Sequence, residues 1–328
     1  MNRATFSHFQ VVFLALICAS YIGSTLCKHV EWHIEIGLLL DAHYHPHPPS
    51  ALRSLQEYYE EMFNSLSRRL SLIGMGRFVF IWTGLYKLTT AESQILFWTP
   101  GRKPTTIEVH RNWISPAAVP IRARVRRKDA VILLTKRTLT LPNGADTTGF
   151  AVKSGMCTKD DLIVVHDDGM FSGENNLLRY LLHSAGVDYD GSGTASRCSA
   201  FGGYLMGSGL LRLPLEFSHC TMALAFRAFS RLTCITSKIG RKAGHLIPKP
   251  PKVSREEFCA IFGADPCDDK GTGKYEHKRP EKYECYAFCC KGISKIIQMA
   301  GPDGLKCDED VLYSKRKRCL LGRCKTAA

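Results

Sequence analysis

Residues 171–191 read FSGENNLLRYLLHSAGVDYDG, and this stretch decides the fold. We expect residues 174–184 within it to form a helix. Gly186 follows closely and is the expected C-terminal cap, because glycine readily adopts the left-handed conformation that closes a helix. The elements predicted before and after the stretch determine what this helix packs against.

Buried strands and helices alternate along the central part of the chain. Apolar runs predict strands at 33–40, 77–88, 129–135 and 162–166. Residues 52–72 have helical spacing, and a further helix is expected within 217–232. The apolar face of the first helix consists of Leu52, Leu55, Tyr59, Met62, Phe63, Leu66 and Leu70. This order of elements is typical of an α/β fold.

The composition excludes wholesale disorder and points to an oxidising compartment. The chain has 328 residues, of which 45% are hydrophobic and 10% aromatic, so it can form a core. The length allows one large domain or two smaller ones. Fourteen cysteines are too many for an ordinary cytosolic enzyme, and eight of them follow residue 258. We therefore expect a disulfide-stabilised protein with a cysteine-rich C-terminal region.

Residues 1–27 have the pattern of a secretory signal peptide. One arginine precedes an apolar run at 11–18, small residues follow, and we expect cleavage near 25–27. No later segment has the run of about 18 apolar residues that a membrane span needs. Cleavage removes Cys18 and Cys27, which leaves twelve cysteines and up to six disulfides. The sequence thus predicts a secreted, extracellular protein.

The C-terminal region is predicted to form a second, small domain. Residues 235–253 are basic and contain prolines, which is typical of a linker. Ser254 and Glu257 have the spacing of a capping box that opens a short helix. Residues 254–328 carry eight cysteines and little apolar periodicity, so we expect this domain to depend on cross-links. Their connectivity is left open, since eight cysteines allow about 105 pairings.

The central stretch resembles the zinc-binding helix of the metzincin metalloproteases, in the adamalysin/reprolysin branch. It is most similar to the secreted salivary members found in ticks. The family pattern is Y-S-G followed by H-E-x-x-H-x-x-G-x-x-H-D-G. Here residues 171–173 match the lead-in, Gly186 the turn glycine, and Asp190 with Gly191 the end of the motif. His183 falls on the second zinc histidine.

Other segments extend the resemblance over nearly all of residues 30–328. Residues 34–41 resemble the family's first strand, 129–137 its substrate-holding edge strand, and 203–206 its Met-turn, with Met206 beneath the metal site. The resemblance implies a twisted mixed sheet packed with long helices at 28–234, followed by a disulfide-rich domain. It also implies the disulfides Cys157–Cys234 and Cys198–Cys220.

Three functional positions of the family motif are replaced. Arg179 stands at the first histidine, Tyr180 at the general-base glutamate and Tyr189 at the third histidine. A catalytic zinc of this kind needs three neutral histidines and an open position for water. An arginine is always charged and offers no lone pair, and a tyrosine with a pKa of about 10 is no base near neutral pH. We therefore expect a pseudoenzyme without catalytic zinc, in which His183 is a remnant ligand.

An active metalloendopeptidase with an atypical ligand set is the alternative. His183, Asp188 and His166 are the residues that would form an improvised zinc site. The competing interpretation is a histidine at a helix end and a solvated aspartate in a loop. Any active form would also need a new general base, because Tyr180 does not supply one.

Two further metal sites are candidates. His43, His45 and His47 alternate in a proline-rich loop, which suits a transition metal but equally a solvated loop that gains charge below about pH 6.5. Glu35 and Asp129 match positions where the family often holds a structural calcium, together with the carbonyl of Cys234. Carboxylate and carbonyl oxygens suit that ion.

The net charge of +14 falls to +13 once Arg3 leaves with the signal peptide. For a secreted protein it favours acidic proteins or sulfated glycans over nucleic acid, and no nucleic-acid module accompanies it. If residues 122–128 are extended, Arg122, Arg124 and Arg126 would lie on one side of the segment. The two clusters are Arg122, Arg124, Arg126, Arg127 and Lys128, and Lys315, Arg316, Lys317 and Arg318. We expect the protein to act by binding extracellular proteins, such as host proteins of haemostasis or matrix, with glycan binding as a further alternative.

Overall fold

The computed structural model describes residues 30–99, 101–125, 128–207, 216–239, 250–267, 285–291, 295–307 and 317–326. The predicted signal peptide at 1–27 lies outside them. Within these ranges, no helix has both the length and the apolar character needed to cross a membrane.

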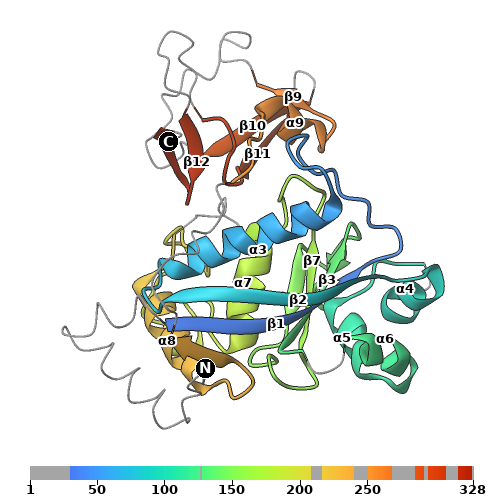
Figure 1. The fold of residues 1–328 in the computed structure, drawn as a ribbon. Helices are drawn as coiled ribbons and strands as arrows, with labels where there is room; N and C mark the ends of the chain where they lie inside the picture. Colours follow the sequence, from blue (N-terminus) through green and yellow to red (C-terminus); the bar gives the residue numbers. More distant parts are fainter. Residues whose placement is uncertain are drawn as a thin grey trace.

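A mixed six-stranded sheet forms the centre of the main domain (Figure 1). Its order is β2-β1-β3-β7-β6, and β8 pairs with β1 off this path. The pairs β1–β2, β1–β3 and β3–β7 are parallel, whereas β6 and β8 run antiparallel to their partners. The strands are β1 Val30–Leu40, β2 Arg77–Lys87, β3 Ala130–Thr135, β6 Gly149–Ala151, β7 Leu162–His166 and β8 Thr236–Ile239. The predicted α/β class with a mixed sheet is confirmed.

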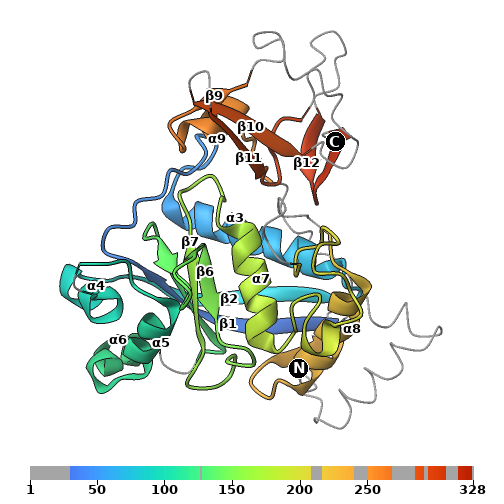
Figure 2. The same ribbon diagram turned by 180° about the vertical axis from the view of Figure 1, so that it is seen from behind.

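Helices cover both faces of the sheet (Figures 1 and 2). On one face lie α3 Leu55–Ser71, α7 Glu174–Ala185 and α8 His219–Arg231, packed on Ile34, Ile36 and Ile132. On the other lie α4 Thr90–Phe97, α5 Thr106–Ile114 and α6 Val119–Arg124, packed on Leu39, Val131 and Leu133. Successive residues of β1 and β3 thus point to opposite cores, as a strand buried on both faces requires.

Strand β3 is internal, which corrects the prediction that residues 129–137 form an edge strand. It pairs with β1 on one side and β7 on the other. A continuous apolar run such as AVILLT suits a strand with neighbours on both sides. At this end of the sheet the outermost strand in the described chain is β6, which precedes β7 in sequence.

Two other expectations are corrected. The basic run is not extended, because residues 119–124 form α6, with proline in its first turn. Arg122 donates from that helix to the carbonyl oxygens of Trp113 and Ser115 at the end of α5, which ties the two helices together. The predicted linker is also shorter at its start, since residues 236–239 form β8 on β1. Residues 240–249 of that linker lie outside the described ranges.

In its described residues, the C-terminal domain combines one short helix with two small sheets. α9 Arg255–Ala260 begins at the predicted capping box, in which Ser254 and Glu257 bond each other's backbone. One sheet contains β9 Asp265–Pro266, β10 Tyr286–Lys291 and β11 Lys295–Ala300, and the other β12 Lys317–Leu320 and β13 Arg323–Thr326. Its disulfides are Cys259–Cys289, Cys267–Cys290, Cys285–Cys319 and Cys307–Cys324. This density of cross-links fits an extracellular protein.

The C-terminal domain lies against α3 of the main domain (Figure 1). Arg68 of α3 is buried there between two carboxylates, with Nε 3.0 Å from Asp303 and Nη2 2.5 Å from Glu61. Met170 of the main domain packs into the core that contains Phe258 and Leu305. These buried contacts couple the C-terminal domain to the segment that leads into α7.

Candidate functional site

The start of α7 is fixed by the buried carboxylate of Asp167. It accepts hydrogen bonds from the hydroxyls of Tyr44 and Tyr58, at 2.5 and 3.0 Å, and from the backbone N–H of Gly173 at 2.8 Å. Phe171 is held with a φ of 61°, and its ring stacks on Tyr58 at 4.6 Å. The three-residue lead-in to the helix therefore has a defined conformation.

The end of α7 turns at Gly186, as predicted. Its φ of 110° is in the left-handed region, and its N–H donates to the carbonyls of Leu182 and His183. A Cβ here would also lie 3.1 Å from the hydroxyl of Ser154. This turn directs the chain back along α7. The ring of Tyr189 therefore lies beside Arg179 and His183 of that helix.

Arg179 holds the turn around Met206 through its guanidinium group. Its Nη1 donates to the carbonyl of Leu205 at 2.8 Å and to the carbonyl of Gly207. Both acceptors flank Met206, which is itself fully buried. The side chain at the first-histidine position is therefore a fixed cation that links α7 to the Met-turn.

Tyr189 lies between two cationic or basic side chains. The guanidinium carbon of Arg179 is 4.2 Å from the centroid of the Tyr189 ring. The imidazole of His183 stacks with the same ring at 4.2 Å, with 17° between the planes. Burial raises the pKa of Tyr189 well above its usual range, although Arg179 opposes this effect. The phenol is therefore neutral at physiological pH and offers no phenolate ligand.

His183 is neutral for two reasons. Burial lowers the pKa of His183, and the positive charges of Lys153 and Arg179 lower it further. Its Nδ1 lies 3.0 Å from the carbonyl oxygen of Val187. Because a carbonyl only accepts, Nδ1 carries the proton and donates. This bond fixes the orientation of the imidazole ring.

Tyr180 covers the edge strand β6 instead of presenting a carboxylate. The side chain is 8% exposed, and its hydroxyl is 3.5 Å from Thr147 Oγ1. Gly149 of β6 has a φ of 146°, and a Cβ there would lie 3.0 Å from the Tyr180 ring. The glycine therefore lets the phenol ring approach the strand.

The donor set at these positions does not suit a catalytic zinc. Arg179 supplies a permanent positive charge where the metal would lie and has no lone pair to donate. Tyr189 is stacked and neutral, and Tyr180 cannot take a proton from water near pH 7. His183 is the single remaining ligand type of the three, and one imidazole does not hold zinc alone.

The residues proposed for an improvised site have separate partners. Asp188 binds Lys153 Nζ at 2.5 Å and accepts from the backbone and hydroxyl of Thr194. Burial raises its pKa, but these contacts outweigh burial and lower the pKa to about 2. His166 bonds Asp168 at 3.1 Å, which raises the pKa of His166. In the described part of the chain, neither belongs to a group of His, Cys, Asp and Glu ligand atoms within 4.8 Å of one another.

Glu35 and Asp129 are adjacent, but each has its own contact. The backbone N–H of Glu35 donates to Asp129 Oδ2 at 2.7 Å, and Lys128 Nζ lies 3.2 Å from Glu35 Oε2. Burial raises the pKa of Asp129 to about 6. An ammonium group therefore lies at one carboxylate of the expected calcium pair, and calcium remains a prediction.

The three loop histidines, His43, His45 and His47, are all exposed. The backbone of His47 instead pairs with the segment before α7, where its carbonyl accepts from the N–H of Met170 at 3.0 Å. Of the described ligand groups within 4.8 Å of one another, none includes these three imidazoles. A metal at this loop stays a prediction.

The described members of the basic clusters contact their own chain. Arg124 forms an ion pair with Glu92 at 3.3 Å and lies over the ring of Tyr86. Arg318 donates to the carbonyls of Val253 and Gly304. Lys317 opens β12. Arg126, Arg127, Lys315 and Arg316 lie outside the described residues.

The disulfides that the family resemblance implied are present in the structure. Cys157 pairs with Cys234 and Cys198 with Cys220. The first links the loop after β6 to the chain that enters β8, and the second links the loop after the motif to the start of α8. The first disulfide thus joins chain segments before and after α7, and the second closes a loop that follows α7.

The partners of Arg179 were not foreseen from the sequence. They are backbone oxygens, 26 and 28 residues away from the arginine. Backbone acceptors have no side-chain signature, so the sequence alone carries no signal for them. The one hint is that a partly buried cation requires acceptors nearby.

One comparison with known proteins identifies a family for part of the main domain. The sequence profile of the reprolysin (M12B) family of zinc metalloproteases matches residues 118–237. A search of curated protein sequences finds no match. The structure of archaemetzincin from Methanopyrus kandleri is 15% identical, with a TM-score of 0.39, over 61% of this chain and 97% of that one. A structure described as a chaperone–substrate complex is 14% identical, with a TM-score of 0.37, over 61% of this chain and 35% of that one. The profile match covers β3, α7 and the Met-turn, so this domain is metalloprotease-like.

Proposed function

We propose that this chain is a secreted, catalytically inactive metalloprotease-like protein that acts by binding extracellular proteins. The observation that carries the proposal is the stack of Arg179, Tyr189 and His183. These three side chains stand at the zinc-ligand positions of the motif and are bonded to one another or to the backbone. A site filled in this way has neither an open metal position nor a base for water.

Arg179 takes over the structural role that a metal would have. In a zinc site the ion would join the helix, the third ligand and the segment beneath them. Here the guanidinium joins α7 to Leu205 and Gly207 and lies on Tyr189. The scaffold is thus held together by a cation of the chain itself, which supports a fold kept for binding and not for hydrolysis.

Strand β6 is the proposed contact for an extended protein segment. In the described chain it pairs with β7 alone, so its other edge has backbone groups available for a further strand. Tyr180 of α7 lies against this strand. Strand addition at such an edge gives main-chain hydrogen bonds, and pockets beside it select side chains.

Export from the cell rests on the signal-peptide pattern and on the disulfides. All twelve cysteines of the described residues are paired. Such pairing persists in oxidising compartments and is rare in the cytosol. The partners proposed are accordingly extracellular, with host proteins of haemostasis or matrix as the first candidates.

The test measures binding and cleavage on the same sample. Immobilised fibrinogen and gelatin are the probes, and intact purified protein is the analyte. We expect saturable binding without any cleavage product, and slower amide exchange at residues 149–151 in the complex. Cleavage that a zinc chelator abolishes would overturn the proposal. Binding that leaves exchange at residues 149–151 unchanged would exclude β6 as the contact.

A further inference from the structure

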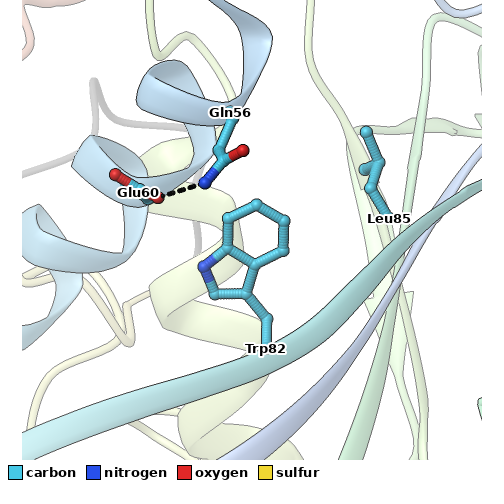
Figure 3. Close-up of a pocket in the computed structure, with 4 residues that line it drawn as sticks. All are labelled: Gln56, Glu60, Trp82 and Leu85. Atoms are coloured by element: carbon cyan, nitrogen blue, oxygen red, sulfur yellow. Dashed lines mark hydrogen bonds between the residues drawn. The ribbon is translucent and has the colours of Figure 1, made fainter.

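A concave site lies at the opposite edge of the main sheet from β6. A cavity of about 370 Å³ opens between α3 and β2 (Figure 3). Gln56 and Glu60 of α3 line one side, and Trp82 and Leu85 of β2 line the other. Its volume is within the usual range for small-molecule sites, about 300–1,000 Å³. Neither the site around Arg179 nor the contact proposed at β6 uses these residues.

An irregularity in β2 places both of its side chains in the cavity. Trp82 and Leu85 are three positions apart, so a regular strand would direct them to opposite faces. The pairing with β1 passes from Ile36–Trp82 to Leu38–Leu85, so β2 has one residue more than β1 between these pairs. A bulge of this kind restores both side chains to one face. The backbone thus constructs the apolar wall of the cavity.

The polar wall of the cavity is rich in hydrogen-bond acceptors. Gln56 Nε2 donates to Glu60 Oε1 at 2.8 Å, as Figure 3 shows, and this bond fixes both side chains one helical turn apart. The amide oxygen of Gln56 and the second carboxylate oxygen of Glu60 remain available as acceptors. Glu60 is exposed and has no ion pair within the described chain.

The N–H edge of the Trp82 indole is directed toward Glu60 and Gln56 (Figure 3), and the ring is held in place. The ring of Tyr59, which is fully buried, meets it edge-to-face at a centroid distance of 6.5 Å and 80°. Trp82 is half-buried, and Leu85 is 40% exposed, so the cavity stays accessible from solvent. Its lining contains one negative charge and no positive charge, in a chain whose net charge is +14.

We propose that this cavity binds an organic ammonium group. An indole face attracts a cation through its quadrupole, and a carboxylate beside it supplies the counter-charge. The acceptors at Glu60 and Gln56 can accept two of the three N–H donors of a primary ammonium. An anion would meet the carboxylate instead, and a metal ion would find too few oxygen ligands. The ligand is therefore an amine with an apolar stem, which Leu85 contacts.

The binding test uses n-butylammonium with the full-length protein. The readouts are the indole N–H resonance of Trp82 and the side-chain amide resonances of Gln56 in a proton–nitrogen NMR spectrum, and the Gln56 resonances serve for Trp82→Leu, which lacks the indole. We expect saturable shifts of these resonances, and no shift with the neutral analogue n-butanol. Trp82→Leu and Glu60→Gln are the test variants, and Trp98→Leu and Glu256→Gln are the matched controls, since both control residues are exposed away from the cavity.

Glu60→Gln is expected to weaken binding roughly two- to fivefold, which is the size of an exposed ion-pair contribution. Because Glu60 is a surface residue, this variant keeps the protein folded, and its result stands if Trp82→Leu does not fold. Nα-acetyl-lysine methylamide is the second probe. Tighter binding than n-butylammonium assigns the cavity to lysine side chains, and equal binding assigns it to free amines. A lack of saturable shifts, or equal loss in Glu256→Gln, overturns the proposal.

Discussion

The guanidinium carbon of Arg179 lies 4.2 Å from the centre of the Tyr189 ring, so two of the residues that the motif comparison aligns with zinc ligands contact each other directly. A cation over a phenol ring is stabilised by about 0.5–1 kcal/mol at exposed sites and by more when water is excluded. The two side chains are therefore complementary, because the Tyr189 ring contacts the Arg179 cation in addition to its stack with His183. Both belong to one rebuilt site.

Arg179→Ala is expected to destabilise the main domain. It leaves the carbonyl oxygens of Leu205 and Gly207 without their donor, and each buried unsatisfied group costs about 1–3 kcal/mol. Chemical denaturation measures the loss. Arg197→Ala is the matched control, because Arg197 is exposed on the loop after the motif. Equal stability of the two variants would contradict a structural role for Arg179.

Restoring the glutamate alone is expected to give no protease. Tyr180→Glu supplies a base, but Arg179 still opposes a metal and Tyr189 still lacks a donor. The triple variant Arg179→His, Tyr180→Glu, Tyr189→His supplies three imidazoles and is expected to bind zinc. Metal analysis after dialysis, with a gelatin cleavage assay, distinguishes the two. His183→Ala added to the triple variant is the control and should lose the zinc again.

Arg68→Ala is expected to lower the free energy of unfolding by about 3–5 kcal/mol, because it leaves the buried Asp303 carboxylate and the buried Glu61 carboxyl group without their cationic partner. Arg77→Ala is the control. Its ion pair with Glu31 is partly exposed and should contribute about 0–1 kcal/mol. A double-mutant cycle with Asp303→Ala isolates the contact between the two domains. Additive effects in that cycle would mean that the pair does not couple them.

Glu61 is expected to make stability fall as the pH rises from about 4.5 to 7. Burial raises the pKa of Glu61 to about 7, although Arg68 lowers it. The folded protein thus holds this proton more tightly than the unfolded chain, whose carboxyl has the ordinary value of 4.5. The resulting stabilisation is complete below the unfolded pKa and is lost as the pH passes the folded one.

The measurement is the free energy of unfolding at several pH values for Glu61→Gln and for the original protein. The variant should have a flatter dependence in this window. Asp129 and Asp161, whose pKa values burial raises to about 6, remain in both proteins and cancel in the difference. Glu60→Gln, on the exposed side of the same helix, is the control. An unchanged slope in Glu61→Gln would refute the assignment.

The sequence predicted the elements whose signals are local. The helix of α7 and its cap at Gly186 depend on residues close together in the chain, and both are present. The position of β3 inside the sheet depends instead on pairing with β1 and β7. The same holds for β8. Its sequence is typical of a linker, and it forms a strand by pairing with β1. Basic residues likewise suggested an extended stripe, whereas Arg122 returns to α5 as a helical side chain.

The replaced ligands could be recognised from the sequence, but not their arrangement. The motif spacing identifies Arg179, Tyr180 and Tyr189 because that spacing is local. The carbonyl oxygens that hold Arg179 are contributed by the backbone of a distant turn. The cavity beside Trp82 requires both a bulge in β2 and the approach of α3. Neither feature has a pattern in residue types, so only the folded chain reveals them.

Zinc content tests the central claim most directly. The full chain, equilibrated with zinc and then dialysed, is analysed by inductively coupled plasma mass spectrometry, and the same sample is assayed on gelatin with and without 1,10-phenanthroline. The filled site around Arg179, Tyr189 and His183 predicts far less than one zinc per chain and no cleavage that the chelator blocks. One tightly bound zinc per chain, together with phenanthroline-sensitive cleavage, would contradict it.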